Sequence, residues 1–219
     1  MKVNTDGVLL GALANAIHPQ TILDIGTGTG VIALMLAQRF QHALIDAVEI
    51  DIEAAATAKK NFKKSIFSDR LSAQSISFQD LDLLYPDKKY DLIVSNPPFF
   101  TNSFKNPDKQ KELARHTSSK LFDELIFFAK SHLQLEGVCC FILPVEAAQY
   151  IISKGKEQGL NLQELINVRS FKDNVAHRQI IKLGFGLADV KAEFIDIYRE
   201  EKVYSEEYRE VLKDFLTIF

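Results

Sequence analysis

The chain has 219 residues, of which 47% are hydrophobic and 25% charged, and its formal net charge at pH 7 is −3. This length predicts one domain with a substantial core, and the composition excludes disordered, collagen-like and disulfide-scaffold proteins. The balanced charge excludes a generally basic nucleic-acid binder, and no apolar run is long enough for a membrane-spanning helix.

The first half of the chain alternates between helix and strand patterns. Thr5 or Asp6 is the expected N-cap of the first helix. In chain order, the predicted elements are a helix over residues 5–17, a strand over 21–25, a glycine-rich turn over 26–30, a helix over 31–40, a strand over 43–50 and a helix over 52–64.

The same alternation continues to the C-terminus, with Gly137, Pro144 and Gly159 expected at the ends of elements. The predicted elements are strands over residues 75–78 and 91–95, a helix over 121–135, a strand over 138–143, a helix over 145–158, an antiparallel pair over 162–169 and 179–187, and a short helix over 205–219. Residues 99–118 show no clear pattern, and loops of this length in compact domains are usually functional or disordered.

Repeated strand–helix–strand units require right-handed crossovers and give a mostly parallel sheet covered by helices on both faces. We therefore predict a single doubly wound α/β domain over residues 1–219. Ligands bind such sheets at the carboxyl ends of the strands. The loops after residues 25, 50, 78 and 95 are expected to converge there.

Cys139 and Cys140 are adjacent within an apolar run. Neighbours on a strand point to opposite faces, so a bridge between these two cysteines is not expected. Free thiols, together with the lack of a recognisable secretory signal, predict a cytoplasmic protein.

The first chemical motif is DIGTGTG at residues 24–30, between a strand and a helix. Glycines there allow a tight turn and close approach of a ligand, and the helix N-terminus offers free N–H groups to an anion. Val31 stands where the dinucleotide fingerprint requires its third glycine, which argues against an NAD or FAD site. A purely structural turn is the alternative.

Carboxylates follow the next two predicted strands. Glu49 ends one strand, where it could accept hydrogen bonds from both hydroxyls of a ribose. Glu49 and Asp51 could instead cap the following helix. Asp80 follows the third strand, where it could accept from the exocyclic amine of an adenine, or Asp80 and Asp82 could simply form a turn.

The most specific motif is Asn96-Pro97-Pro98-Phe99, directly after the strand DLIVS. Two prolines fix a stiff loop, because each locks φ and lacks an N–H group. We expect this loop to aim the Asn96 amide oxygen and backbone carbonyls at a planar NH₂ group, on which Phe99 can stack. A turn that merely ends the strand is the alternative.

Positive charge is concentrated in two stretches. Residues 101–120 carry a net charge of +3, which leaves −6 on the rest of the chain. A second basic run later in the chain contains Arg169, Lys172, Arg178 and Lys182. Either stretch could contact RNA phosphates or be a solvated charged face. The five histidines show no ligand-like spacing, so no metal is expected.

These motifs, in this order, resemble the class I S-adenosylmethionine-dependent methyltransferases, in particular the branch that methylates planar amino groups through an Asn-Pro-Pro-aromatic tetrapeptide. The resemblance implies a Rossmann-like, seven-stranded sheet whose last strand is antiparallel. It implies that the methionine part of the cofactor lies at Asp24, Gly26, Thr27, Gly28 and Gly30, the ribose at Glu49 and Ile50, the adenine at Asp80 and Leu81, and the target amine at Asn96, Pro97, Pro98 and Phe99.

A narrower resemblance is carried by residues 1–11 (MKVNTDGVLLG), residues 95–100 (SNPPFF) and Ala114-Arg115-His116. They resemble the bacterial valine-tRNA adenine-37 N6-methyltransferases, in which the Lys-x-x-Thr-Asp-Gly segment closes over the cofactor. The resemblance implies that residues 1–20 close the cofactor site through Thr5 and Asp6, and that residues 99–120 form a substrate loop. The implied RNA contacts are Lys2, Phe99, Lys105, Lys109, Lys111, Arg115 and His116.

This resemblance implies N6-methylation of a tRNA adenine by a monomeric enzyme, with S-adenosyl-L-homocysteine as the second product. Three alternatives remain at this point: N2-methylation of guanine in ribosomal RNA, N5-methylation of a protein glutamine, and a non-catalytic module that binds cofactor or RNA. The Asn-Pro-Pro-Phe motif argues against the last, because binding alone does not require acceptors for an amine.

Overall fold

The computed structural model describes residues 4–98 and 107–217, with only the backbone described for residues 107–118. Its first half contains α1 (Thr5–Leu13), β1 (Thr21–Ile25), α2 (Val31–Arg39), β2 (Leu44–Val48), α3 (Ile52–Lys64), β3 (Leu71–Gln74), α4 (Phe78–Leu84) and β4 (Tyr90–Ser95). Its second half contains α5 (Pro107–His132), β5 (Leu133–Leu143), α6 (Val145–Glu157), β6 (Asn161–Arg169), β7 (Arg178–Gly184), β8 (Ala192–Asp196), β9 (Tyr198–Glu200), β10 (Val203–Tyr204) and α7 (Glu206–Leu212).

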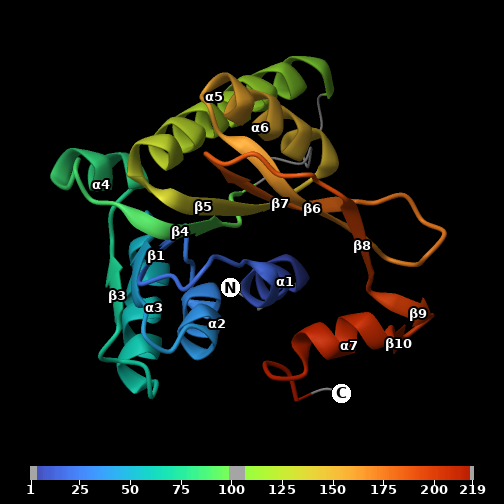
Figure 1. The fold of residues 1–219 in the computed structure, drawn as a ribbon, viewed down its shortest axis with the longest axis horizontal. Helices are drawn as coiled ribbons and strands as arrows, with labels where there is room; N and C mark the ends of the chain where they lie inside the picture. The colour runs from blue at the N-terminus through green and yellow to red at the C-terminus, as the bar shows by residue number, and fades with distance from the viewer. Residues whose placement is uncertain (1–3, 99–106, 218–219) are drawn as a thin grey trace.

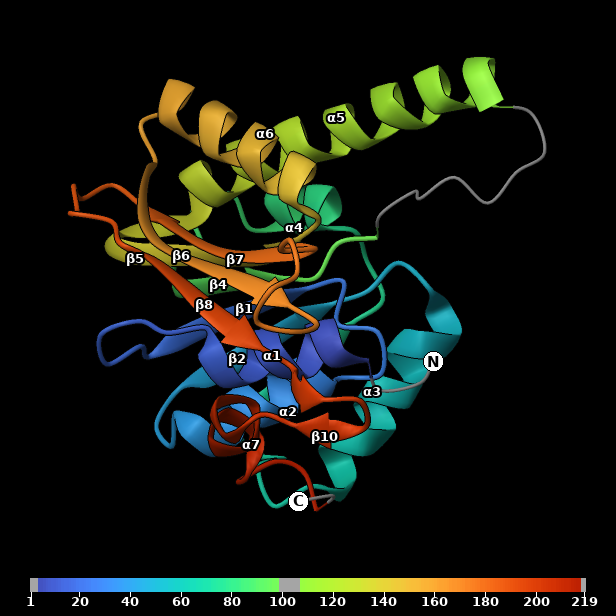
Figure 2. The same cartoon turned by 90° about the vertical axis from the view of Figure 1, so that its right-hand side faces the viewer.

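Eight strands form one sheet in the order β3-β2-β1-β4-β5-β7-β6-β8. Strands β1 to β5 pair in parallel, whereas β7 is antiparallel to both β5 and β6. Helices α1, α2 and α3 lie on one face of the sheet, and α5 and α6 lie on the other (Figures 1 and 2). The predicted doubly wound α/β fold is confirmed, and β7 is the expected antiparallel strand.

The sheet has one strand more than the seven expected. Strand β8 pairs in parallel with β6 at the edge of the sheet. Of its five residues only Ile195 is buried, so its sequence lacks the apolar pattern that identifies the central strands. The pairing of an edge strand depends on the neighbouring strand more than on its own sequence. Strand β8 was therefore not predictable from local hydrophobicity.

Each face of the sheet has its own hydrophobic core. Cys140 belongs to the cluster that includes α1 and α2, and Cys139 to the cluster that includes α5 and α6. The two thiols are free and buried on opposite faces, as the alternation of side chains along a strand predicts.

Two predicted boundaries near the N-terminus were wrong. The N-cap of α1 is Asn4, whose Oδ1 accepts from the Gly7 N–H at 2.7 Å, and the helix ends at Leu13 instead of residue 17.

The strand predicted over residues 75–78 is also wrong, because β3 ends at Gln74 and Phe78 begins α4. Ser77 and Asp80 form a capping box there, which starts a helix.

The region predicted as an unstructured loop over residues 99–118 was partly misassigned. From Pro107 onward it is the first part of α5, a single helix of 26 residues. Proline is favoured in the first turn, and the following Lys, Gln, Glu, Leu, Ala and Arg residues are good helix formers. At its other end α5 stops at His132 instead of residue 135, and Gly137 lies inside β5.

Some of the remaining elements match their predictions closely, whereas the helix predicted over residues 205–219 ends at Leu212 and the strand predicted over 179–187 ends at Gly184. Helix α3 has the predicted bounds, and α6 is followed by Gly159 at φ +85°, the left-handed conformation expected after a helix. Strands β6 and β7 form the predicted antiparallel pair.

Arg70 supports the end of α2 through three backbone carbonyls. Its guanidinium donates to the oxygens of Ala37, Phe40 and Ala43 at 2.9, 3.0 and 2.9 Å. We expect Arg70→Met to lower the free energy of unfolding by about 2 kcal/mol, since all three acceptors lose a charged donor. Urea denaturation measures this change, with exposed Arg209→Met as the control. Equal stability of the Arg70 variant and the parent would contradict the role of Arg70.

Candidate functional site

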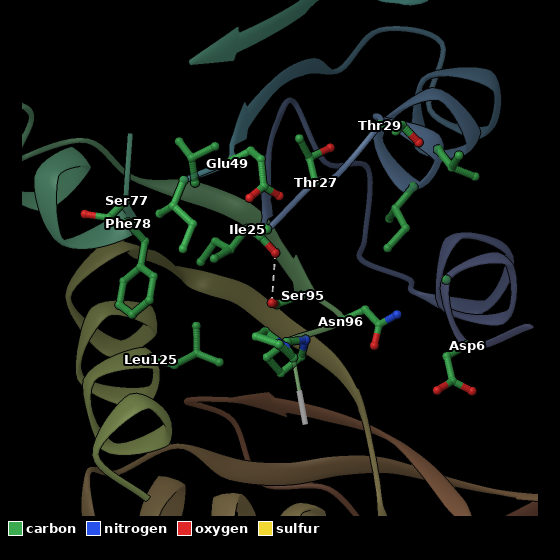
Figure 3. Close-up of a pocket in the computed structure, with 18 of the residues that line it drawn as sticks. Asp6, Ile25, Thr27, Thr29, Glu49, Ser77, Phe78, Ser95, Asn96 and Leu125 are labelled. Atoms are coloured by element: carbon green, nitrogen blue, oxygen red, sulfur yellow. Dashed lines mark hydrogen bonds between the residues drawn. The ribbon is translucent and has the colours of Figure 1, made fainter. Parts of the chain in front are cut away.

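A cavity of about 870 Å³ opens at the carboxyl ends of the central strands. It is lined by segments that follow β1, β2, β3 and β4, by the start of α1 and by α5. The loops after residues 25, 50 and 95 therefore converge as expected, whereas the loop expected after residue 78 is replaced by the segment between β3 and α4 and the start of α4. Figure 3 shows side chains from these segments around the cavity. This volume lies near the upper end of the range for small-molecule sites, roughly 300–1,000 Å³.

The glycine-rich turn forms one wall. The N–H groups of Gly26 and Thr27 both donate to the Val48 carbonyl, at 2.9 and 3.1 Å, which ties the turn to the end of β2. Gly30 has a φ of +89°, and a Cβ there would lie 2.4 Å from the Phe62 ring. Gly30 caps α2 without a side chain, so the first N–H groups of that helix face the turn.

Asp24 is completely buried directly before this turn. Its Oδ2 accepts from the Thr27 hydroxyl at 2.6 Å, whereas Oδ1 has no hydrogen-bond partner within the part of the chain that is described. Burial raises the pKa of Asp24 to about 7, against the lowering effect of the Thr27 hydrogen bond. A buried carboxylate oxygen without a protein partner is uncommon in native structures. Asp24 itself is not among the residues that line the cavity, and neither are Gly28 and Gly30, so of the residues predicted to hold the methionine part only Gly26 and Thr27 line it.

Glu49 lies at the end of β2 and lines the cavity. Its carboxylate accepts from the Gly28 N–H at 2.8 Å and from the Asp51 N–H at 3.0 Å. Asp51 instead caps α3, with Oδ1 accepting from the Ala54 N–H at 2.8 Å. Of the two interpretations left open for these acids, helix capping therefore holds for Asp51. Glu49 lines the cavity instead, together with Ile50.

The structure does not bring Asp80 or Leu81 to the cavity. The Asp80 carboxylate accepts from the N–H and hydroxyl of Ser77, and Leu81 is completely buried in the core. The wall expected from these two residues is formed by Ile76, Ser77, Phe78 and Gln79, with Leu121 and Leu125 of α5. Figure 3 shows Leu125 beside Phe78. The Ser-x-x-Asp spacing is a capping-box signal that could have identified the helix start and thus the correct wall.

Asn96, Pro97 and Pro98 line the cavity directly after β4. The preceding Ser95 is buried and donates its hydroxyl to the Ile25 carbonyl at 2.9 Å, which locks the end of β4 to the end of β1. Figure 3 shows the Asn96 amide at the cavity, between Glu49 and Asp6. The elbow formed by residues 96–98 therefore lies beside the glycine turn.

The N-terminal helix contributes Asp6, Gly7 and Val8 to the lining, together with its cap Asn4, whereas Thr5 is not among the lining residues. Asp6 forms an ion pair with Arg178, which also lines the cavity; the Nε–Oδ2 distance is 2.8 Å. The sequence indicated Arg178 only as part of a basic run.

That basic run is largely engaged within the protein. Arg169 pairs with Asp196, Arg178 with Asp6, and Lys182 with Glu164. Three of its four cations therefore have acidic partners, which reduces the positive field that the run could offer to RNA phosphates.

Several predicted contacts are not placed. Lys2, Phe99 and Lys105 lie outside the described residues, as do the side chains of Lys109, Lys111, Arg115 and His116. Over the residues that are described, no group of His, Cys, Asp or Glu side chains could hold a metal ion. Over the same residues, no helix has the length and apolarity needed to cross a bilayer.

Comparison with known proteins gives a consistent family. A model of the methyltransferase small domain matches residues 4–144. A tRNA1(Val) (adenine(37)-N6)-methyltransferase of Pedobacter heparinus is 45% identical over the whole chain and 92% of its own length. An enzyme of the same name from Parabacteroides distasonis is 41% identical over 98% of this chain and 90% of its own length. One from Vibrio campbellii is 36% identical over 98% of this chain and 88% of its own length.

Solved structures share the fold at lower identity. A predicted O-methyltransferase from Agrobacterium tumefaciens superposes with a TM-score of 0.75 at 16% identity, over 95% of this chain and 96% of its own. A ribosomal protein L11 methylase from Lactobacillus delbrueckii gives 0.57 at 19% identity, over 81% of this chain and 76% of its own.

The buried carboxylate of Asp24 has a measurable consequence for stability. Its pKa is raised from 3.8 to about 7 in the folded protein, so the folded state binds more protons than the unfolded state between these values. The carboxylate therefore destabilises the fold progressively as the pH rises through this window. We expect Asp24→Asn to be more stable than the parent at pH 8, by up to about 4 kcal/mol, and equally stable near pH 4. Chemical denaturation at both pH values tests this; an unchanged pH dependence in the variant would contradict it.

Proposed function

The chain belongs to the tRNA1(Val) (adenine(37)-N6)-methyltransferase family, and from this premise we propose that it transfers a methyl group from S-adenosylmethionine to N6 of adenine 37 in a valine tRNA. Relatives with that name match nearly the whole chain at 36–45% identity. The observation that carries the proposal is the position of the Asn96–Pro98 elbow beside the glycine turn in one cavity. We also propose a cytoplasmic location, which a tRNA substrate favours.

The residues present fit the cofactor that the family and fold imply. The Asp24 Oδ1 without a partner suits the amino group of the methionine part, and the α2 N-terminus suits its carboxylate. A carboxylate offers about four acceptor positions, of which Glu49 uses two on the N–H groups of Gly28 and Asp51. The remaining positions are available to ribose hydroxyls. Phe78 and Leu125 offer apolar surfaces to the adenine.

When bound, the cofactor supplies an electrophilic methyl on a sulfonium whose leaving group is neutral. The protein then needs to position the target nitrogen and exclude water, because no strong base is required. An aromatic NH₂ is a poor nucleophile, since its lone pair is delocalised into the ring. Acceptors on Asn96 and Pro97 hold its two hydrogens, favour a pyramidal nitrogen and offset the positive charge that develops on it.

The target adenine must leave its stack to reach this depth. Bases in RNA loops are splayed out at low cost, which suits a nucleotide beside the anticodon. The cavity of about 870 Å³ has room for the cofactor together with such a base. We place RNA contacts on the segment 99–120 from its charge, with Lys105, Lys109, Lys111 and Arg115 as the candidates.

The alternatives to this substrate are less well supported. Guanine N2 and the side-chain amide nitrogen of glutamine also carry planar NH₂ groups that an Asn-Pro-Pro elbow could hold. Full-length relatives named for tRNA adenine favour adenine over both. A non-catalytic module would not need the rigid acceptors that line this cavity.

We expect Asn96→Ala to lower methyl transfer about 10²–10³-fold, the usual effect of removing one preorganised transition-state group. The cofactor affinity should stay within a few-fold, because Asn96 is assigned to the target amine. Mass spectrometry of nucleosides from valine tRNA incubated with labelled cofactor measures N6-methyladenosine directly. Exposed Gln134→Ala is the control. Near-normal turnover by Asn96→Ala would refute the assignment.

The cofactor affinity should depend on pH through Asp24. Its pKa of about 7 means that the carboxyl is mostly protonated at pH 6 and mostly ionised at pH 8. If the ionised form receives the cofactor amino group, S-adenosylhomocysteine should bind roughly tenfold more weakly at pH 6 than at pH 8. Calorimetry on the parent and on Asp24→Asn tests this. The same pH dependence in both proteins would move the amino-group contact elsewhere.

A further inference from the structure

Helix α1 is held firmly along its length but reaches the cavity only at its first turn. It packs against α2 and α7, and Gly11 lies so close to Met35 that a Cβ would come within 2.8 Å of the sulfur. At its C-terminal end, Arg39 donates to the carbonyls of Gly11 and Ala14 at 2.9 and 2.6 Å. The body of the helix is therefore fixed independently of the cavity.

The first turn has its own anchor, 172 residues away in the sequence. The Asp6 carboxylate accepts from Arg178 Nε at 2.8 Å, and the side chains are only 20% and 26% exposed. Arg178 also donates to the His177 carbonyl at 2.9 Å and is the first residue of β7, which pairs with strands on both sides. The ion pair thus joins a helix end to the rigid sheet at the cavity.

A second contact acts on the same turn. The Thr5 side chain lies beside the hydroxyl of Tyr208, a buried residue of α7. The Tyr208 ring stacks on Tyr204, which stacks on Tyr198, with centroids 5.2 Å apart at each step. Adjacent residues Thr5 and Asp6 are therefore both held by the C-terminal third of the chain.

Asp6 is expected from its family resemblance to serve the cofactor, yet one of its oxygens is already occupied by Arg178. We propose that Arg178 is a positioning residue that holds Asp6, and through it the first turn of α1, across the cavity, so that this ion pair controls how fast the cofactor leaves. Arg178 then acts through Asp6, and Asp6 is not an independent cofactor ligand. This inference rests on the proposed cofactor site.

A double-mutant cycle separates positioning from direct contact. The variants are Asp6→Asn, Arg178→Gln and their combination, and the probe is the release rate of S-adenosylhomocysteine in a stopped-flow displacement experiment. Loss of one charge-assisted hydrogen bond predicts a roughly tenfold faster release for each single variant. The double variant should match the singles within twofold, because the same interaction is lost each time. Arg178→Lys, which keeps the charge but not the guanidinium geometry, should lie between the parent and Arg178→Gln.

The chain offers a closely matched control. Arg169 and Asp196 form a bidentate ion pair between β6 and β8, with Nε–Oδ1 at 2.7 Å and side chains 18% and 14% exposed, and Arg169 lies at the same end of the sheet as Arg178. Neither residue lines the cavity. Arg169→Gln should lower the melting temperature at least as much as Arg178→Gln, because it loses two hydrogen bonds to Asp196, but it should leave the release rate unchanged.

Hydrogen exchange on the ligand-free protein provides a readout that does not depend on the cofactor. Arg178→Gln should speed exchange of the amides of residues 7–10, and Arg169→Gln should not. Additive effects in the cycle, unchanged release in the single variants, or unchanged exchange in Arg178→Gln would each overturn the proposal. Failure of the parent to bind S-adenosylhomocysteine would instead refute the proposed function, while the exchange result would still decide whether Arg178 holds the first turn.

Discussion

The site depends on the parallel pairing of β1 with its two neighbours in the centre of the sheet. Ile25 is level with Val48 of β2 on one side and with Ser95 of β4 on the other. Three segments far apart in sequence therefore leave the sheet at the same level: the glycine turn, Glu49 and the Asn-Pro-Pro elbow. The hydrogen bonds from Gly26 and Thr27 to the Val48 carbonyl, and from Ser95 to the Ile25 carbonyl, fix these strand ends together. No long loop has to find its place independently.

Asp24 shows how function opposes stability within this arrangement. A buried carboxylate with one oxygen that lacks a partner among the described residues is unfavourable in a folded core, and burial accordingly raises its pKa. An apolar or amide side chain at position 24 would destabilise the fold less than this carboxylate does. A carboxylate at this position is explained by the proposed function, in which the cationic amino group of the cofactor supplies the missing donor.

Elements and site segments could be predicted from the sequence where a local residue pattern specifies them. Apolar runs bounded by glycine and proline identified the central strands, and the motifs at their ends identified three parts of the cavity wall: the glycine turn, Glu49 and the Asn-Pro-Pro elbow. The start of α5 was missed because its basic residues were interpreted as a charged loop, although their helix propensity was high. The residues next to Asp80 were missed because a capping box was interpreted as a strand end.

The Asp6–Arg178 pair could not have been predicted, since it depends on how α1 docks against a strand 172 residues later. Strand β8 was missed because its pairing partner, and not its own pattern, defines it.

The most direct test of this account is a crystal structure of the protein with S-adenosylhomocysteine. The account predicts that its amino acid part lies against the glycine turn near Asp24 and that its ribose hydroxyls contact Glu49. Its sulfur should face the Asn96 amide across a gap wide enough for one methyl group and the target nitrogen. Binding of the ligand elsewhere, or with the sulfur turned away from residues 96–98, would contradict the central claim.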